Sequence, residues 1–139
     1  MKVLVCDPIA DKGVELLKEA GHDVDVKTGM SPDELLACIA DYHAVIVRSA
    51  TKIRKPAIDK GENLKVVARG GVGLDNIDVA YAQEKGIKVL NTPGASTISV
   101  AELAMAHMLA AARFVGRGTA GMKQGQWEKK KLKGIELSG

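Results

Sequence analysis

The sequence predicts an α/β domain built on a mostly parallel sheet. Short apolar runs, typical of buried strands, alternate up to Asn91 with amphipathic stretches typical of helices. The chain has 139 residues, enough for a single core, and its hydrophobic content of 46% and charged content of 27% are those of an ordinary globular protein.

Each element has its own local signal. Lys2–Cys6 is a continuous apolar strand, and the helix Ile9–Ala20 that follows is expected to end in a left-handed cap at Gly21. Ser31 and Glu34 form a capping box, with Pro32 at the first helical position. The other expected elements are an edge strand His22–Lys27, a helix to about Ala40, a strand Ala44–Val47, a helix Pro56–Lys60, a strand Leu64–Arg69, a helix Ile77–Lys85 ended by Gly86, and a strand Ile87–Leu90. Together they indicate a doubly wound, flavodoxin-like, parallel five-stranded sheet in the order 2-1-3-4-5.

The remainder of the chain, residues 99–139, is predicted to be a crossover helix and a basic tail, separate from a domain of residues 1–98. Ser99 and Glu102 suggest a second capping box. Ala101–Ala112 is apolar almost all round, interrupted only by His107, so this helix is expected to be buried on several sides. It is too short for a membrane span.

The charge distribution and the cysteines bear on whether the protein binds nucleic acid, a metal ion or a membrane. From Arg113 onward seven basic residues face two acidic ones, a pattern that nucleic-acid-binding tails share. That segment holds one aromatic residue, Trp127, and no nucleic-acid motif, which favours a solvated or anion-facing role. Cys6 and Cys38 lack metal-ligand spacing, and we expect reduced thiols in a cytoplasmic protein without a signal peptide, a metal site or a membrane partner.

Two arginines at strand ends mark a candidate anion site. Arg48 and Arg69 each end a predicted strand, at the sheet edge where open α/β sheets bind ligands. Three of the four residues Gly70–Gly73 are glycine, which favours close approach of a ligand to the backbone. The plainer alternative is that the arginines mark where buried strands emerge and that Asp75 or Asn76 caps the next helix.

The same turn imitates a dinucleotide-binding fingerprint without completing it. Asn76 stands at the third glycine position, and the following strand ends in Asn91 instead of an acidic residue. A self-contained NAD site is therefore not expected here.

The stretch VARGGVGLDNIDVAYAQEKGIKVLNTPGASTISVAELAMAHMLAAAR (67–113), with IVRSATKI (46–53) and WEKKKLKGIELSG (127–139), resembles the D-isomer-specific 2-hydroxyacid dehydrogenases. The resemblance covers essentially the whole chain and is strongest to the members that oxidise 3-phosphoglycerate to 3-phosphohydroxypyruvate in serine synthesis. It implies the substrate-binding part of an NAD-dependent homodimer that associates through residues 99–139. A nucleotide-binding domain, which carries the catalytic His, would follow Gly139. This chain alone is therefore expected to be inactive and to bind NAD poorly.

The resemblance also implies roles for individual residues. Those expected at the small anionic substrate are Arg48, Ser49, Arg69, Gly70, Gly71, Asn91 and Lys129, the last from a neighbouring subunit. Val72 is expected to touch the nicotinamide end of the cofactor.

Other functions remain open. Dehydrogenases for lactate, glycerate or glyoxylate share the family, and a binding or dimerisation module without activity shares the fold. A phosphoacceptor receiver would need Asp where Arg48 stands, and an FMN domain would need a Ser/Thr-rich loop where Asp7–Ala10 stands.

Overall fold

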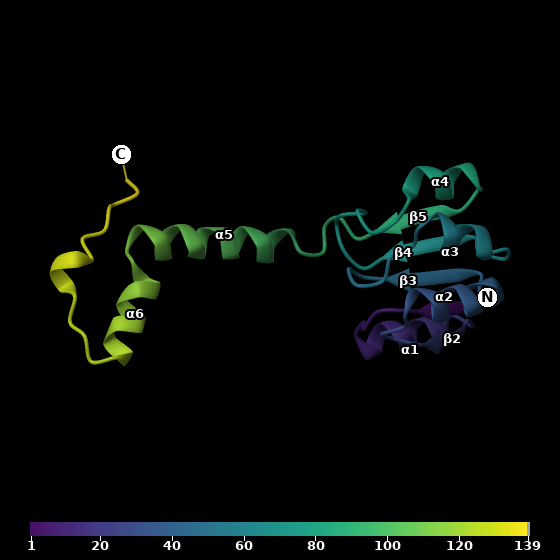
Figure 1. Ribbon diagram of the computed structural model, residues 1–139, viewed down its shortest axis with the longest axis horizontal. Helices are drawn as coiled ribbons and strands as arrows, with labels where there is room; N and C mark the ends of the chain where they lie inside the picture. The colour runs from purple at the N-terminus through teal and green to yellow at the C-terminus, as the bar shows by residue number, and fades with distance from the viewer. Residues whose placement is uncertain (139) are drawn as a thin grey trace. The chain divides into compact units, whose positions relative to one another are not determined.

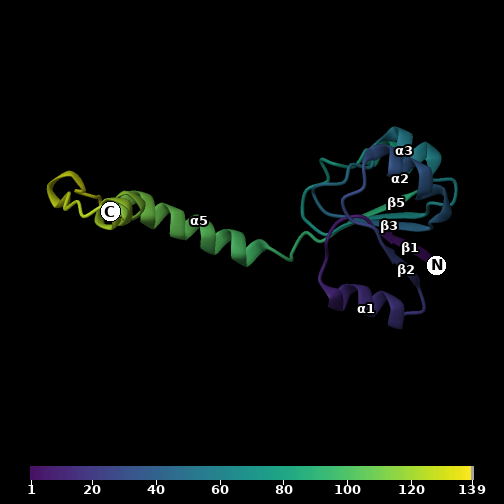
Figure 2. The ribbon, with the colours of Figure 1, turned by 60° about the horizontal axis from the view of Figure 1, so that its bottom comes forward.

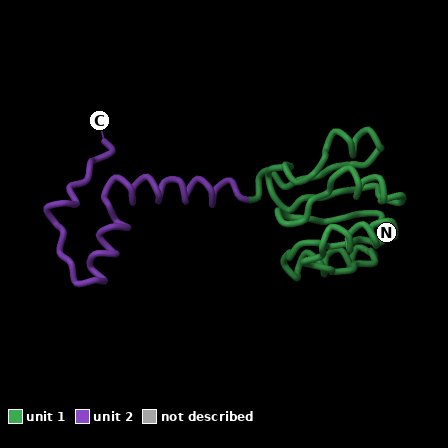
Figure 3. The backbone as a smooth tube through the Cα atoms, in the orientation of Figure 1, with its two compact units in different colours: residues 1–95 green, residues 96–139 purple. Residues whose placement is uncertain are grey.

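The computed structural model describes residues 1–138. These residues form two compact units, one of residues 1–95 and one that begins at Ser96 (Figure 3). The boundary predicted from the sequence lies between residues 98 and 99. The first unit carries the sheet and all of its flanking helices.

The first unit is a five-stranded parallel sheet, as the sequence predicts. Its strands follow the order β2-β1-β3-β4-β5. Their bounds are β1 Lys2–Val5, β2 Asp23–Val26, β3 Ala44–Val47, β4 Val66–Arg69 and β5 Lys88–Asn91. Val47, Arg69 and Asn91 pair in one row across the last three strands, so these strands end level with one another.

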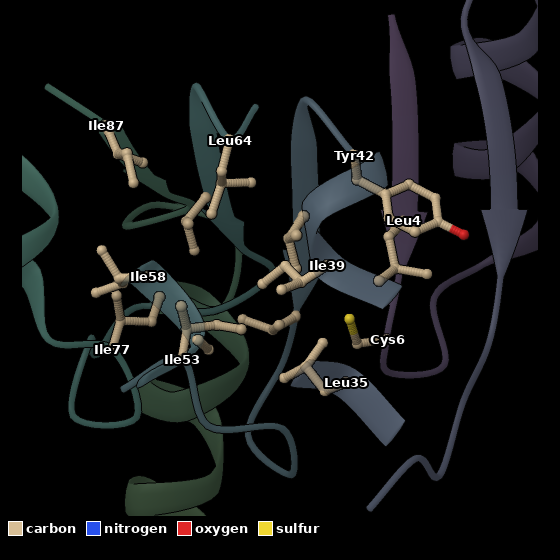
Figure 4. Packing of buried hydrophobic residues seen from close by; sticks show 14 of the residues in the cluster. Leu4, Cys6, Leu35, Ile39, Tyr42, Ile53, Ile58, Leu64, Ile77 and Ile87 are labelled. Atoms are coloured by element: carbon tan, nitrogen blue, oxygen red, sulfur yellow. The ribbon is translucent and has the colours of Figure 1, made fainter. Parts of the chain in front are cut away.

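Helices cover both faces of this sheet. They are α1 Asp11–Glu19, α2 Pro32–Cys38 with the 3-10 turn η1 Ile39–Asp41, α3 Lys55–Lys60 and α4 Val79–Glu84. Helix α1 lies on one face, while α2 and α3 lie on the other (Figures 1 and 2). The buried core includes Leu4 of β1 and Cys6 just after it, together with Leu35 of α2 and Ile39 of η1 (Figure 4).

The helix caps of this unit match the local signals. Ser31 and Glu34 form the predicted capping box: the Ser31 hydroxyl accepts from the Glu34 amide, and Glu34 Oε2 accepts from the Ser31 amide at 2.7 Å. Gly21 and Gly86 have φ values of +80° and +76°, which side chains other than glycine rarely adopt. Both predicted helix ends are therefore confirmed.

The second unit contains α5 Thr97–Ala112, α6 Val115–Lys123 and the 3-10 turn η2 Lys129–Lys131. The predicted capping box of Ser99 and Glu102 is wrong, because α5 begins at Thr97 and its N-cap, Ser96, makes no side-chain hydrogen bond. No proline or glycine stands between Gly94 and Ser99, so the helix extends upstream of the expected start.

The apolar side chains of α5 find no cover within their own unit. Leu103, Met105, Met108 and Leu109 are all more than half exposed. Within residues 1–138 no single helix has the length and composition of a membrane span, although α5 and α6, bent by 65° between them, together resemble a broken one.

Candidate anion-binding site

Polar side chains gather at one edge of the sheet in the first unit. Asp7 follows β1, Arg48 follows β3, Arg69 ends β4 and Asn91 ends β5. Because all the strands are parallel and β3, β4 and β5 end in register, these residues belong to the same carboxyl edge. The register therefore brings together the three strand ends that the sequence singles out.

A buried carboxylate fixes the loop after β3. Asp7 is only 3% exposed and accepts hydrogen bonds from the Arg48 amide at 2.6 Å and from the Thr51 hydroxyl at 2.6 Å. Burial works against the charge of this carboxylate, but the hydrogen bonds from Thr51 and from backbone amides outweigh it and lower its pKa. The sequence reasoning missed Asp7, because an aspartate after a first strand gives no sign of its partners.

A buried amide holds the same loop from its other side. Asn76 is 3% exposed, and its Nδ2 donates to the carbonyls of Arg48 at 2.9 Å and Thr51 at 2.7 Å. The alternative that Asn76 caps a helix is wrong, because α4 begins at Val79 and its N-cap is Asp78. One side-chain amide thus donates to two carbonyls of this loop and fixes their positions relative to each other.

The fixed loop presents Arg48 and Ser49 outward. Both residues are exposed. One guanidinium nitrogen of Arg48 donates to the Pro8 carbonyl at 3.4 Å, and within residues 1–138 the side chain forms no ion pair. The Arg48 guanidinium thus keeps most of its donors for a ligand.

The glycine turn offers free donors, although not the expected ones. The Gly70 amide donates to the Val47 carbonyl at 2.9 Å, and the Gly71 amide donates to the Arg69 carbonyl at 3.0 Å. In the described part of the chain, the amides of Val72 and Gly73 donate to no protein group. An anion that binds this turn in the present conformation would therefore meet the N–H groups of Val72 and Gly73.

The missing side chains of this turn make room for an arginine. None of the glycines at 70, 71 and 73 has a positive φ. A Cβ on Gly73 would lie 3.1 Å from Arg69 Nη1, and one on Gly71 would lie 3.4 Å from Arg69 Nε. The Arg69 side chain thus packs along the turn, which accounts for part of the glycine pattern without a ligand.

A carboxylate pairs with this arginine. Arg69 Nη1 lies 2.7 Å from Asp75 Oδ1, and the hydrogen bond from Arg69 holds the pKa of Asp75 below its usual value. The Arg69 side chain is 12% exposed, and its Nε is buried with no partner. The alternative that Asp75 caps a helix is also wrong, for the same reason as for Asn76.

The last strand ties the turn to the sheet. Asn91 Nδ2 donates to the Val72 carbonyl at 2.7 Å, and the Thr92 amide donates to the Gly71 carbonyl at 3.0 Å. The Val72 side chain remains 50% exposed beside these contacts. Asn91 therefore orients the turn that carries the free amides.

The other predicted ligand group lies elsewhere in the chain. Lys129 belongs to η2 in the second unit, and its role stays a prediction. Among residues 1–138, no group of three or more His, Cys, Asp and Glu side chains could hold a metal ion.

Comparison with known proteins shows the family to which the chain belongs. Residues 3–131 match the family described as D-isomer specific 2-hydroxyacid dehydrogenase, catalytic domain. The chain is 52% identical to the D-3-phosphoglycerate dehydrogenase of Methanocaldococcus jannaschii; the match covers the whole of this chain and 26% of that protein. It is 51% identical to the hydroxypyruvate reductase of Thermotoga maritima; that match covers 99% of this chain and 45% of the reductase.

A solved structure is similar to most of the chain. The NAD⁺-bound 3-phosphoglycerate dehydrogenase of Entamoeba histolytica superimposes with a TM-score of 0.72 and 37% identity. The match covers 81% of this chain and 39% of that one. The chain thus spans about a quarter to a half of the length of these relatives.

Proposed function

Because the chain belongs to the D-isomer specific 2-hydroxyacid dehydrogenase family, we propose that it forms the substrate-binding part of an NAD-dependent D-3-phosphoglycerate dehydrogenase. That enzyme oxidises 3-phosphoglycerate to 3-phosphohydroxypyruvate. The cytoplasmic location expected from the sequence belongs to the same proposal.

The observation that carries the proposal is the pair of arginines at neighbouring strand ends beside two free amides. A substrate with a carboxylate and a phosphate needs two separate groups of donors. The amides of Val72 and Gly73 with Arg69 form one group, and the exposed Arg48 with Ser49 forms the start of the other. Guanidinium groups suit both anions because they donate two parallel hydrogen bonds. Lys129 of a neighbouring subunit would complete the second group.

The chain's own residues fit one end of NAD. Val72 is an apolar residue of the glycine turn and is half exposed, so its side chain can pack against the nicotinamide ring. When bound, NAD would supply the acceptor for the hydride that leaves the carbon carrying the substrate's hydroxyl group. This chain holds and orients the substrate for that transfer.

None of the histidines of the first unit lies at the anion-binding edge. His43 precedes β3, at the opposite end of the strand from Arg48, and its Nδ1 accepts from the Lys2 amide at 3.1 Å. His22 precedes β2 at that same opposite end. The base that takes the hydroxyl proton is therefore expected from another part of the enzyme.

Hydroxypyruvate reduction is the second candidate, because the reductase from Thermotoga maritima is 51% identical to this chain. Its substrate lacks the phosphate and would leave Arg48 and Lys129 without an anion to bind. The two activities thus differ in their need for the second cationic group.

Steady-state kinetics of the enzyme that contains this chain test the proposal. We expect higher kcat/KM for 3-phosphoglycerate than for glycerate, and Arg69→Ala should raise KM about tenfold or more because a charged hydrogen-bonded contact is lost. Arg48→Ala should lower kcat/KM for 3-phosphoglycerate more than for glycerate. Equal loss with both substrates would favour the hydroxypyruvate reaction, and unchanged KM in Arg69→Ala would contradict the proposed site.

A further inference from the structure

The contact between Asp75 and Arg69 joins one exposed and one buried side chain. The Asp75 side chain is 84% exposed, while that of Arg69 is 12% exposed, and 2.7 Å separates Oδ1 from Nη1. An exposed carboxylate gains little by pairing for its own sake, since water solvates it well. The contact therefore matters mainly for the position of the Arg69 side chain.

The carboxylate sits on a fixed support. Arg54 Nη2 donates to the backbone carbonyl of Asp75 at 2.9 Å, and Arg54 Nη1 lies 2.9 Å from Asp78 Oδ1. Asp78 also accepts from the Lys55 amide at 2.9 Å, so the support reaches the start of α3. The backbone of Asp75 is thus held before any ligand arrives.

The pairing leaves one side of the Arg69 guanidinium without partners. Nη1 is occupied by Asp75, whereas Nε is buried and unpaired. Nη2 donates to no group within residues 1–138. Nε and Nη2 together form the side of a guanidinium that can donate two parallel hydrogen bonds to one carboxylate or phosphate. A buried unpaired N–H is unfavourable until an acceptor reaches it.

We propose that Asp75 is a positioning residue that holds Arg69 by Nη1 so that its Nε–Nη2 side is reserved for the anionic group of the substrate. This inference rests on the proposed function, since it takes Arg69 as a substrate ligand. It adds a residue that does not touch the substrate. Gly73 belongs to the same arrangement, because a Cβ at this position would lie 3.1 Å from Arg69 Nη1 and crowd the held guanidinium, whereas one on Gly71 would make an ordinary contact of 3.4 Å with Nε.

Two opposing effects decide whether Asp75 strengthens or weakens binding of the anion. The Asp75 charge repels an anionic ligand, but the side chain is exposed, and such screened charges change affinity by about fivefold or less. Without Asp75, the Arg69 side chain must be ordered on binding, which can weaken affinity by up to about thirtyfold. Ordering therefore outweighs repulsion, and Asp75 favours binding.

The test follows the Arg69 Nε–Hε resonance by NMR while the ¹⁵N-labelled chain is titrated with 3-phosphoglycerate. Asp75→Ala should raise Kd about tenfold, and Asp75→Asn, which keeps an acceptor at this position, should stay within about threefold of the wild type. The free Nε–Hε signal should be sharp in the wild type and broadened in Asp75→Ala. Asp59→Ala is the matched control, because it removes another surface carboxylate paired with a cation, Lys85 at 3.1 Å.

A double variant separates this inference from the proposed function. Arg69→Ala combined with Asp75→Ala should bind no more weakly than Arg69→Ala alone, since Asp75 acts only through Arg69. An Asp75→Ala chain that binds as tightly as the wild type, or more tightly, while Arg69→Ala binds weakly, would overturn the positioning role and leave the site intact. Wild-type affinity in Arg69→Ala would instead overturn the proposed site, and the positioning role with it.

Discussion

Asp7 at the end of β1 accepts a hydrogen bond of 2.6 Å from the backbone amide of Arg48 at the end of β3. The same carboxylate binds the Thr51 hydroxyl and amide, so one buried charge sets the shape of the loop that carries Arg48 and Ser49. The conformation of the anion site thus depends on a residue that need not touch the substrate.

Asp7→Ala should lower the free energy of unfolding of the first unit by about 1–3 kcal/mol, because buried donors lose their acceptor. The folded-state pKa of Asp7 is below its usual value of 3.8. Its contribution is therefore present above that pH and is lost as the pH falls through the folded-state pKa. Urea denaturation of both proteins between pH 7 and pH 2 should show the difference shrinking only in acid. If the two free energies of unfolding differ by the same amount at every pH, the charge of Asp7 does not contribute to stability.

Asn76→Asp should destabilise the protein more than Asn76→Ala, although aspartate is closer in shape to asparagine. A carboxylate would face the carbonyls of Arg48 and Thr51, which need donors, and repulsion adds to the loss of about 1–3 kcal/mol expected for alanine. The gap between the two variants should close below pH 4, where the new carboxyl group is protonated and can donate. Thermal denaturation at pH 7 and pH 3 measures this; equal melting temperatures at pH 7 would contradict it.

Gly73→Ala should impair anion binding with little effect on stability. A Cβ at this position would lie 3.1 Å from both Arg69 Nη1 and Asp75 Oδ1, so both side chains must shift by a few tenths of an ångström from their paired positions. We expect a rise in Kd for 3-phosphoglycerate of about tenfold, the equivalent of one charged hydrogen bond. Gly13→Ala in α1 is the matched control, since its Cβ would meet only Ile9 at an ordinary 3.5 Å. Calorimetry that finds the same affinity in both variants would remove the glycine turn from the site.

Much of the fold was predictable because it follows from local signals. The apolar runs gave the strands, Ser31 and Glu34 gave a helix start, and connection rules gave the strand order. Arg48, Arg69 and Asn91 were expected at one edge because parallel strands end together. The start of α5 was misplaced, since several adjacent residues can begin an apolar helix and only packing chooses among them.

The internal supports of the site were not predictable in the same way. Asp7 and Asn76 act on residues that are 41 and 28 positions away, and a sequence shows a polar residue without its distant partner. The glycine turn carried a mixed signal, because Gly71 and Gly73 leave room for Arg69 as well as for a ligand. The sequence also does not show which amides of the turn are used internally: those of Gly70 and Gly71, expected at the substrate, donate to backbone carbonyls, and those of Val72 and Gly73 are free within residues 1–138.

The chain should self-associate through residues 99–139, because α5 is apolar almost all round and its large apolar side chains are exposed. Burying a large apolar side chain contributes about 1.5–3 kcal/mol, so Leu103, Met105, Met108 and Leu109 together favour pairing of two helices. Sedimentation should show a dimer that Leu103→Glu with Met108→Glu dissociates. Leu16→Glu, at an equally exposed position on α1, is the control. A wild-type chain that stays monomeric at high micromolar concentration and binds no hydrophobic dye would contradict this.

Amide NMR shifts of the ¹⁵N-labelled chain test most directly whether the carboxyl edge of the sheet binds the two anionic groups of 3-phosphoglycerate. Because the proposed function assigns this chain only the substrate-binding part of the enzyme, we expect Kd on the order of millimolar, or about −4 kcal/mol. We expect 3-phosphoglycerate to shift the amide signals of residues 48–51, 69–73 and 91 together, and glycerate to shift those of residues 69–73 more than those of residues 48–51. Shifts confined to the basic residues 113–133, or no shifts at millimolar ligand, would contradict it.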